Sequence, residues 1–213
     1  TFFSGNYIPT DLYYSDVDGN WNADGDSLFG EAFQDSANQG DGVNLIPDLY
    51  VGRAPIISLS QAQVFVDKTL QYSRTPLGDY EDKGIFAAEV LFPQDWSSGM
   101  SISLDGASDA ESAIRKLTPD MKPRRMYENY TVYDTVAAVK LTRAALIDSL
   151  NKGWGIMHHV GHGFRNSMSV GDAPLTNPDA DALTNGNRIW LLYSINCTSN
   201  AIDFASLGEA FVL

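Results

Sequence analysis

Apolar residues follow two patterns along this chain, one with the period of a helix and one as short continuous runs. The segment 61–73 has helical spacing, and Ser60 with Gln63 forms a capping box in front of it. The segment 84–91 (GIFAAEVL) is an apolar run of strand length. The same two patterns predict further helices at 108–117, 139–153 and 177–186, and further strands at 49–57, 125–132, 154–160 and 189–195.

Alternating strands and helices are typical of an α/β fold with a mainly parallel sheet and helices on both faces. The run at 189–195 (IWLLYSI) is apolar or aromatic almost throughout, which predicts a strand covered on both faces. Residues 1–48 are rich in Gly, Asn, Asp and Tyr and show little periodicity. They are predicted to form loops with at most a short strand.

Two of the predicted strands lead to side chains that can carry out chemistry. The run 154–160 precedes His162, and the run 189–195 precedes Cys197. Functional residues collect at the carboxyl ends of parallel strands, so neighbouring strands would bring both residues to one edge of the sheet. A thiolate is a strong nucleophile near neutral pH, and histidine can handle its proton. Either residue alone is more often structural, but the pair favours catalysis.

The neighbouring histidines allow a competing interpretation. His158 and His159 stand close to His162 in the sequence HHVGH, which suggests a zinc site. Adjacent residues of a strand point to opposite faces, so the three rings cannot easily converge. The glutamate of an HExxH motif is also missing. His158 and His159 are therefore predicted to be structural or to line a pocket.

Composition excludes some classes of function. The formal net charge of −13 argues against a nucleic-acid partner, because such proteins carry basic surfaces. No apolar run approaches the roughly 18 residues of a membrane span. The chain opens at Thr1 without a basic and then apolar stretch, so a targeting segment is expected to be absent or removed. With one cysteine, Cys197, no internal disulfide can form.

Many carboxylates gather between positions 11 and 48, beside Asn and Gly rather than beside basic residues. Close carboxylates repel each other unless a cation lies among them. The spacing of Asn20, Asn22, Asp24, Gly25 and Glu31 fits a calcium loop, although no clear helix precedes it. A structural calcium ion is one interpretation and a surface loop of Asx turns is the other. The candidate ligands are Asp16, Asp18, Asn20, Asn22, Asp24, Asp26 and Glu31.

An apolar block that ends in His-Gly, followed by one that ends in Cys, resembles the signature of the caspase-like clan of cysteine peptidases. Further residues narrow the resemblance to the gingipain family: the triplet 161–163 (GHG), its interval to Cys197, and the downstream 203–204 (DF) and 208–210 (GEA). The segments 50–53 (YVGR) and 9–31 are also similar to that family. The resemblance spans nearly the whole chain and implies a caspase-like three-layer sandwich.

The resemblance also implies catalytic roles. Cys197 would form the acyl-enzyme, and His162 would deliver a proton to the leaving amine. The N–H groups of Gly163 and Cys197 would form the oxyanion hole. Glu89 falls where gingipains keep a carboxylate that orients the histidine, although a residue there can also be a solvated strand end. No cofactor is implied for this chemistry.

Known gingipains cut after Arg or Lys, and Asp105 falls in about the right region to bind that charge. The loop at 92–103 departs from the family pattern, which leaves basic specificity open. A gingipain-type domain normally has more sheet before a segment such as 1–48 and another strand after the cysteine. The chain is therefore expected to be one incomplete catalytic domain, with an acidic segment at 1–48 and an α/β core at 49–213.

The leading interpretation is an extracellular or cell-surface cysteine endopeptidase that acts on protein or peptide substrates. A second chain of the same processed precursor would be its other partner. Some gingipain relatives are sortase-like transpeptidases that pass the acyl group to an amine, which is the second interpretation. The third is a catalytically idle binding module stabilised by calcium.

Overall fold

The computed structural model describes residues 9–31, 40–41, 43, 46–74 and 77–213. The chain divides into two compact units, Thr1–Pro55 and Ile56–Leu213. The first contains the predicted acidic segment 1–48 together with 49–55, and the second contains the rest of the predicted α/β core. Each unit is described by itself.

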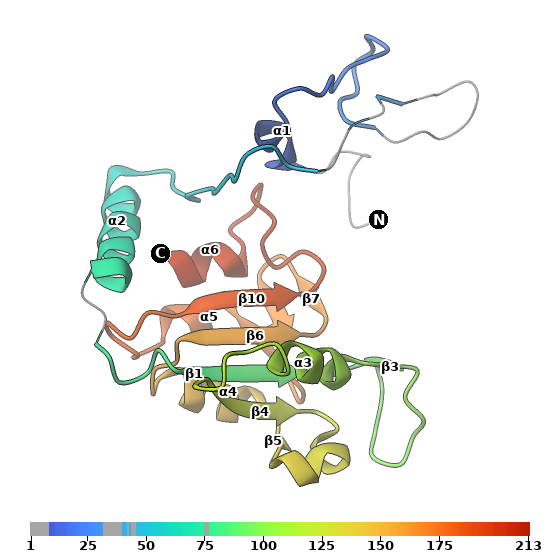
Figure 1. Ribbon diagram of the computed structural model, residues 1–213, viewed down its shortest axis with the longest axis vertical. Coiled ribbons are helices and arrows are strands. Elements are labelled where there is room, and N and C mark those ends of the chain that lie inside the picture. The colour runs from blue at the N-terminus through green and yellow to red at the C-terminus, as the bar shows by residue number, and fades with distance from the viewer. Residues whose placement is uncertain (1–8, 32–39, 42, 44–45, 75–76) are drawn as a thin grey trace. The chain divides into compact units, whose positions relative to one another are not determined.

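The second unit is built on a five-stranded sheet with the strand order β10-β6-β1-β4-β5 (Figure 1). Every neighbouring pair in this sheet is parallel. All the carboxyl ends of its strands therefore lie at one edge. The strands are β1 (Lys83–Ala88), β4 (Lys122–Tyr127), β5 (Val139–Lys140), β6 (Ile156–Val160) and β10 (Leu191–Ile195).

Apolar side chains alternate between the two faces of the central strand β1, and both sets are buried. Ile85 and Ala87 belong to a core cluster with residues of α4 (Arg143–Leu150), α5 (Asn177–Asp181) and α6 (Leu207–Val212). Phe86 and Ala88 belong to a second cluster with α3 (Gly106–Ile114). Because helices cover both faces, the predicted three-layer α/β sandwich is confirmed.

The remaining elements of this unit surround the sheet. The helix α2 (Leu59–Arg74) confirms the helix predicted at 61–73. Two small antiparallel sheets lie outside the main one. One pairs β2 (Val90–Phe92) with β3 (Leu104–Asp105); the other joins β7 (Gly163–Phe164), β8 (Ser167–Ser169) and β9 (Pro174–Thr176), and a 3-10 helix, η1, spans Tyr130–Val136.

Several predictions about individual elements were wrong. Residues 49–57 form no strand, although their backbone is described throughout. Val139 lies in β5, because α4 begins after the cap Thr142. The α3 helix begins at Gly106, two residues before the predicted start at 108, with Asp105 as its N-cap. The last two errors concern where helices begin, which depends on side-chain bonds that an apolar pattern does not contain.

The prediction that 189–195 is covered on both faces was also wrong. β10 is at the end of the strand order, and its outward residues Leu191, Tyr193 and Ile195 are 55%, 59% and 45% exposed. An apolar run indicates a strand but does not say whether that strand is central or at an edge.

Within its described residues, the acidic unit contains one short helix, α1 (Leu12–Ser15), and carboxylate side chains hold much of the backbone. Asp16 accepts hydrogen bonds from Gly19 N and from Trp21 Nε1, at 2.9 and 2.8 Å. Buried Asp41 accepts from Ala23 N and Gly30 N. Asx-type bonds between residues two positions apart also occur, at Asn20, Asp24 and Asp26.

Candidate active site

Four reactive side chains follow the carboxyl ends of four adjacent strands. The register aligns Ile195 of β10 with Val160 of β6, Val160 with Ala88 of β1, and Ala88 with Tyr127 of β4. Cys197 and His162 each stand two residues beyond this level, and Glu89 and Glu128 each stand one residue beyond it. The prediction that the His and Cys blocks end parallel neighbouring strands is confirmed. In strand order, the edge carries Cys197, His162, Glu89 and Glu128.

Cys197 lies in a loop that follows the edge strand β10, and its side chain is exposed. The residue before it, Asn196, donates from Nδ2 to Ser194 Oγ at 2.7 Å. Asn196 Oδ1 accepts from Ser199 N at 3.3 Å. The thiol is thus open to solvent on a loop whose neighbouring side chain is fixed to β10, as a nucleophile requires.

His162 is held by a backbone carbonyl at its ring. Nε2 lies 2.9 Å from Leu91 O in β2, and Nδ1 lies 3.4 Å from Gln94 Nε2. A carbonyl oxygen only accepts, so Nε2 carries the proton and Nδ1 is the basic nitrogen of the neutral ring. Phe92 packs against the ring edge to face, with the centroids 5.9 Å apart. These contacts fix the tautomer and leave Nδ1 to exchange a proton.

Glu89 is 5% exposed, so the alternative of a solvated strand end is wrong. Its carboxylate accepts from His162 N at 3.2 Å and from Gly171 N at 2.8 Å. It therefore holds the backbone of His162, whereas the ring bonds to the Leu91 carbonyl. Burial raises the pKa of Glu89, and the two backbone N–H groups oppose that shift. A catalytic role for Glu89 stays a prediction, now through the backbone instead of the ring.

Glu128 is the fourth side chain at this edge and was missed in the sequence. Its Oε2 accepts from Val90 N at 2.9 Å, and burial raises its pKa while the nearby His162 lowers it. Glu128 lines a cavity of about 340 Å³ together with Asp172 and Lys140. The sequence pattern placed Glu128 inside a strand at 125–132, whereas β4 ends at Tyr127, so its position at a strand end was overlooked.

Asp105, the residue predicted to bind a basic substrate side chain, has other partners. Its carboxylate accepts from Ala107 N at 3.0 Å as the N-cap of α3. It also accepts from Asn129 Nδ2 at 3.1 Å and from Tyr133 Oη at 2.7 Å. These contacts give Asp105 a structural role, and its substrate-binding role stays a prediction without support from them.

The backbone around Gly163 leaves a donor available. Ser169 N donates to His162 O at 2.9 Å, which makes Gly163 and Met168 a non-hydrogen-bonded pair of the β7–β8 hairpin. The Gly163 N–H group is therefore outside that ladder. This arrangement agrees with the predicted oxyanion role, which remains a prediction.

The other two histidines lie on opposite faces of β6, as the alternation of a strand requires. His158 stacks between Phe86 and Tyr193, with ring centroids 5.6 and 5.5 Å apart. His159 is fully buried on the other face. Neither ring faces a ligand shared with His162, and this geometry excludes a zinc site formed by all three histidines.

The acidic residues divide into two groups instead of a single loop. Carboxylate oxygens of Asp24, Asp26 and Glu31 lie within 4.8 Å of one another. Those of Asp16, Asp18 and Asp48 do the same, and Asp48 was missed because it is 30 residues further along. The two predicted asparagines join the first group's loop: Asn20 Oδ1 accepts from Asn22 N, and Asn22 Nδ2 donates to Asp26 O.

The donor set near Asp24 fits a hard cation. Among the described residues, Asn22 Oδ1 is a buried oxygen without a hydrogen-bond partner, and its own amide contacts the loop of Asp26. Calcium takes such carboxylate and amide oxygens as ligands. Calcium binding remains a prediction of the sequence that these residues can accommodate.

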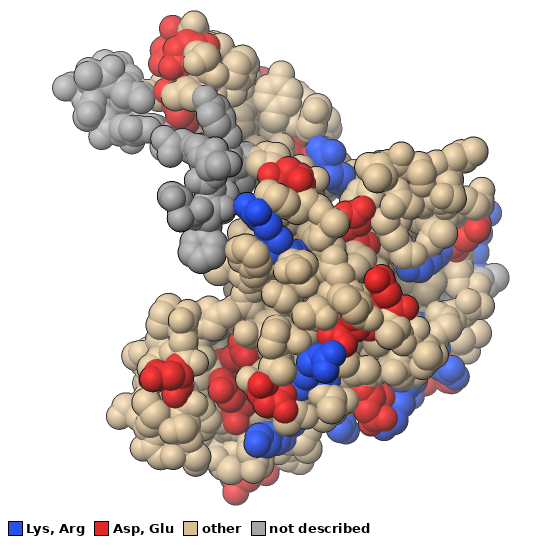
Figure 2. Space-filling view, turned by 180° about the vertical axis from the view of Figure 1, so that it is seen from behind, with Lys and Arg blue, Asp and Glu red and all other residues tan. Residues whose placement is uncertain are grey.

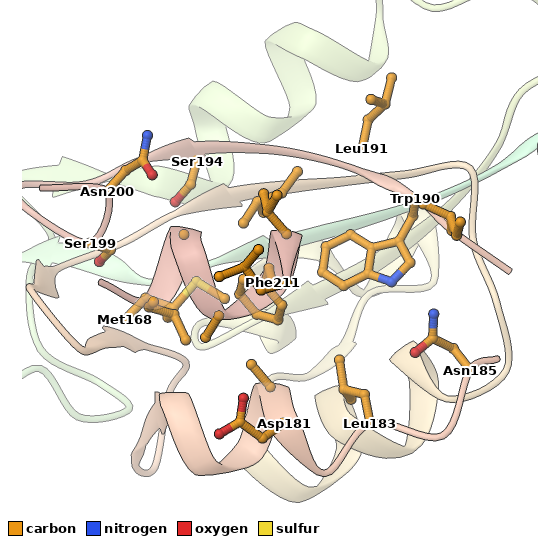
Figure 3. A pocket seen from close by; sticks show the side chains of 18 of the residues that line it. Met168, Asp181, Leu183, Asn185, Trp190, Leu191, Ser194, Ser199, Asn200 and Phe211 are labelled. Carbon is orange, nitrogen blue, oxygen red and sulfur yellow. The ribbon is translucent and has the colours of Figure 1, made fainter. Parts of the chain in front are cut away.

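A larger cavity of about 850 Å³ lies between β10, α5 and α6 (Figure 3). Ser194, Ser199 and Asn200 are at one end of it, toward the loop of Cys197, and Trp190 is at the other. Figure 2, which views the protein from behind relative to Figure 1, shows Lys and Arg side chains interspersed with Asp and Glu. Within the described part of the chain, no helix has the length and apolar character to cross a membrane.

Three solved structures share this fold. They are the arginine-specific cysteine proteinase gingipain R (TM-score 0.65, 15% identity), a complex of RgpB pro- and mature domains from Porphyromonas gingivalis (0.64, 16%), and a structure described as a protease (0.62, 19%). Each match covers 96% of this chain but 40%, 41% and 37% of the other chain. The chain thus spans about two fifths of their length.

The comparison with curated proteins found no match. The model of peptidase family C25 matches residues 1–213. Together with the gingipain-like fold, this match confirms the resemblance drawn from the His-Gly and Cys blocks. The chain therefore belongs to peptidase family C25.

Proposed function

We propose that this chain carries the catalytic pair of a cysteine endopeptidase, with Cys197 as nucleophile and His162 as proton carrier. The observation that carries the proposal is their common level at the carboxyl ends of the paired strands β10 and β6. Exposure of the thiol and a tautomer of His162 fixed by Leu91 O support it. Membership of a cysteine peptidase family supports the reaction class.

The reaction follows from these groups. The Cys197 thiolate attacks the scissile carbonyl carbon, a C–S bond forms, and the carbonyl oxygen takes the negative charge. The N–H groups of Gly163 and Cys197 donate to that oxyanion. The C–N bond then breaks, and His162 gives its proton to the leaving amine. Water attacks the thioester, with His162 taking a proton, and releases the acid product and the thiolate.

Glu89 acts through the backbone in this proposal. By accepting the N–H groups of His162 and Gly171, its carboxylate keeps the His162 main chain at a fixed distance from β1. Geometric precision of this kind is worth large factors in rate, because small displacements of a catalytic group are costly.

Replacement of Cys197 by Ala tests the assignment. The variant and the unmodified chain are incubated with a mixed peptide library, and cleavage is followed by mass spectrometry. Turnover is expected to fall to the background rate for Cys197→Ala and for His162→Ala. Ser112→Ala on the exposed surface of α3 is the control and should cleave normally. Unchanged turnover by Cys197→Ala would end the assignment. An added amine that appears in the products would indicate transpeptidation.

We also propose a preference for basic residues before the cleaved bond, with the cavity of Glu128 and Asp172 as the binding site. Two carboxylates line this cavity and one cation, Lys140, opposes them. Its position at the edge that carries His162 supports the idea, since Glu128 directly follows β4. Glu128 is half-buried, and partial burial strengthens the attraction of its carboxylate for a guanidinium or ammonium group.

The library experiment also tests this preference. Glu128→Gln should lower kcat/KM for Arg and Lys peptides about tenfold relative to neutral peptides, whereas Asp105→Asn should lower both classes equally through stability. The reverse pattern would assign the pocket to Asp105. A library cleaved without any basic preference would contradict the proposal for both residues.

Processing and location form the last part of the proposal. A solved complex of pro- and mature domains of RgpB supports a processed precursor, whose other chain would be a partner of this one. An extracellular or cell-surface location accords with such processing. We further propose a structural calcium ion at Asp24, Asp26 and Glu31, supported by their clustered oxygens and the buried Asn22 oxygen.

A further inference from the structure

His159 is a buried imidazole that the proposed reaction does not use. It lies in β6 three residues before His162, is 0% exposed, and is opposite Ser194 of β10 in the register. Its Nδ1 lies 2.8 Å from Ser194 Oγ, and its Nε2 lies 2.7 Å from Ser169 O in β8. Both ring nitrogens are therefore engaged, one by each neighbouring element.

These partners fix the protonation of the ring. Ser169 O only accepts, so Nε2 carries a proton, and the neutral ring accepts the Ser194 hydroxyl proton at Nδ1. Burial lowers the pKa of His159 to about 4, with Ser169 O opposing that shift. The ring is thus neutral near neutral pH, and the O–H group of Ser194 is oriented toward His159 Nδ1.

The orientation of the Ser194 hydroxyl determines the next hydrogen bonds, which reach the loop of Cys197. Because the Ser194 hydroxyl donates its hydrogen bond to His159 Nδ1, Ser194 Oγ is free to accept one from Asn196 Nδ2, at 2.7 Å. Asn196 Oδ1 then accepts from Ser199 N at 3.3 Å, and Ser199 Oγ donates to Ser167 O at 2.7 Å. This series of bonds connects β6 to both sides of Cys197. Figure 3 shows Ser194 and Ser199 together at one end of the larger cavity.

The same imidazole is packed against the backbone that leads to His162. A Cβ atom on Gly161 would lie 2.7 Å from His159 Nε2 and 2.8 Å from Glu89 Oε2. A Cβ atom on Gly163 would lie 2.5 Å from Ser199 Oγ and 2.7 Å from Asn196 Oδ1. The two loops of the catalytic pair therefore touch this network without space for a side chain between them.

We propose that His159 is a positioning residue that sets the Cys197 loop relative to His162 through Ser194 and Asn196. This inference rests on the proposed function. It adds a determinant of the thiol's position beyond the catalytic pair and Glu89. A purely structural histidine would stabilise the fold without altering the chemistry of the folded protein.

Four variants of the full chain separate these roles. Ser194→Ala and Asn196→Ala break the series of bonds with small changes. His159→Leu removes both ring bonds, whereas His159→Gln can donate an amide N–H to Ser169 O and accept from Ser194. Ser149→Ala is the matched control, because it removes another buried hydroxyl, which bonds to Ala145 O at 2.7 Å in α4.

Two readouts are used on folded protein. The first is the rate of Cys197 alkylation by iodoacetamide at a fixed pH, which needs no substrate. Ser194→Ala and Asn196→Ala should lower this rate about tenfold, because the loop no longer fixes the thiol relative to His162. The second is peptide cleavage, where kcat should fall about tenfold to a hundredfold with KM little changed. His159→Gln should recover most of what His159→Leu loses.

The outcomes are distinct. If His159→Leu does not fold, Ser194→Ala and Asn196→Ala decide the question. Wild-type kcat and an unchanged alkylation rate in these two variants would overturn the proposal, even if their stability falls as in Ser149→Ala. Failure of the proposed function is recognised separately, because Cys197→Ala would then keep its activity.

Discussion

The two units of this protein are each stabilised by a different kind of internal interaction. In the α/β unit, strands such as β1 are buried on both faces, and the reactive residues follow from strand ends. In the acidic unit, Trp21 is the one large apolar residue that is buried among those described, and carboxylates such as Asp16 and Asp41 hold the backbone. Apolar burial is non-directional, so a core tolerates small changes in side-chain position. Each hydrogen bond to a carboxylate, in contrast, depends on the position of one oxygen atom.

The difference should determine what a substitution can affect. A change near the sheet edge should alter both activity and stability, because the same contacts position His162 and fill the core. A change in the acidic unit should alter only that unit's stability.

The largest effect is expected from a methyl group at Gly161. In Gly161→Ala the new Cβ would meet His159 Nε2 and Glu89 Oε2 below 3 Å, so the backbone of His162 must shift. Activity should fall about a hundredfold, with a stability loss of about 1–3 kcal/mol from overpacking. Peptide cleavage and thermal unfolding measure the two effects.

The comparison variant is Gly25→Ala in the acidic unit. Gly25 has a φ of 75°, and nothing lies within 4 Å of its added Cβ. A left-handed alanine should cost about 1–2 kcal/mol locally and leave cleavage unchanged. Equal activity losses in Gly25→Ala and Gly161→Ala would mean that the two units are not independent in this respect.

The sequence predicts the α/β unit better than the acidic one, and for a physical reason. Apolar runs identified the strands before His162 and Cys197, and parallel topology then brought both to one edge. The contact between the Leu91 carbonyl and the His162 ring could not be predicted, because every residue has a carbonyl and only the folded structure shows which one lies beside the ring. Asp105 resembled a pocket residue because nothing local distinguishes a ligand from an N-cap. In the acidic unit, Asp48 joins Asp16 across about 30 residues without any periodic signal.

The next effect in size concerns pH. The folded-state pKa of His159 is about 4, below its unfolded value of about 6.5, so the unfolded chain binds more protons between these values. The stabilisation is complete above pH 6.5 and is lost as pH falls through 4. The free energy of unfolding of the α/β unit should thereby decrease by about 3 kcal/mol.

Urea unfolding at pH 7, 5.5 and 4.5 measures this loss, with His159→Gln as the comparison. Because carboxylates also take up protons in acid, the quantity of interest is the difference between the two proteins. The difference should change with pH by the amount attributed to His159. Parallel pH curves for both proteins would contradict the prediction. Burial lowers the pKa of His158 as well, so its contribution has the same sign in both proteins.

A smaller effect should come from two matched carboxylates. Glu89 and Asp41 are 5% and 7% exposed, and each accepts backbone N–H groups in its own unit. Glu89→Gln and Asp41→Asn should each cost about 1–3 kcal/mol, because an amide N–H group then faces a donor. Only Glu89→Gln should also reduce kcat, by about tenfold. Cleavage assays on the folded variants, with limited proteolysis of the acidic unit, distinguish the outcomes.

The smallest effect is expected from calcium, and it should be confined to the acidic unit. At ten times the dissociation constant, an ion bound only by the folded state adds about 1.4 kcal/mol. Terbium is a suitable probe, because its emission is sensitised by nearby aromatic rings such as Trp21, which is packed under Gly30. Asp26→Asn should weaken terbium binding, whereas Asp120→Asn in the α/β unit should not. If a chelator lowers the unfolding temperature of Asp26→Asn as much as that of the unmodified chain, the ion binds elsewhere and the carboxylates of this loop are held by turns alone.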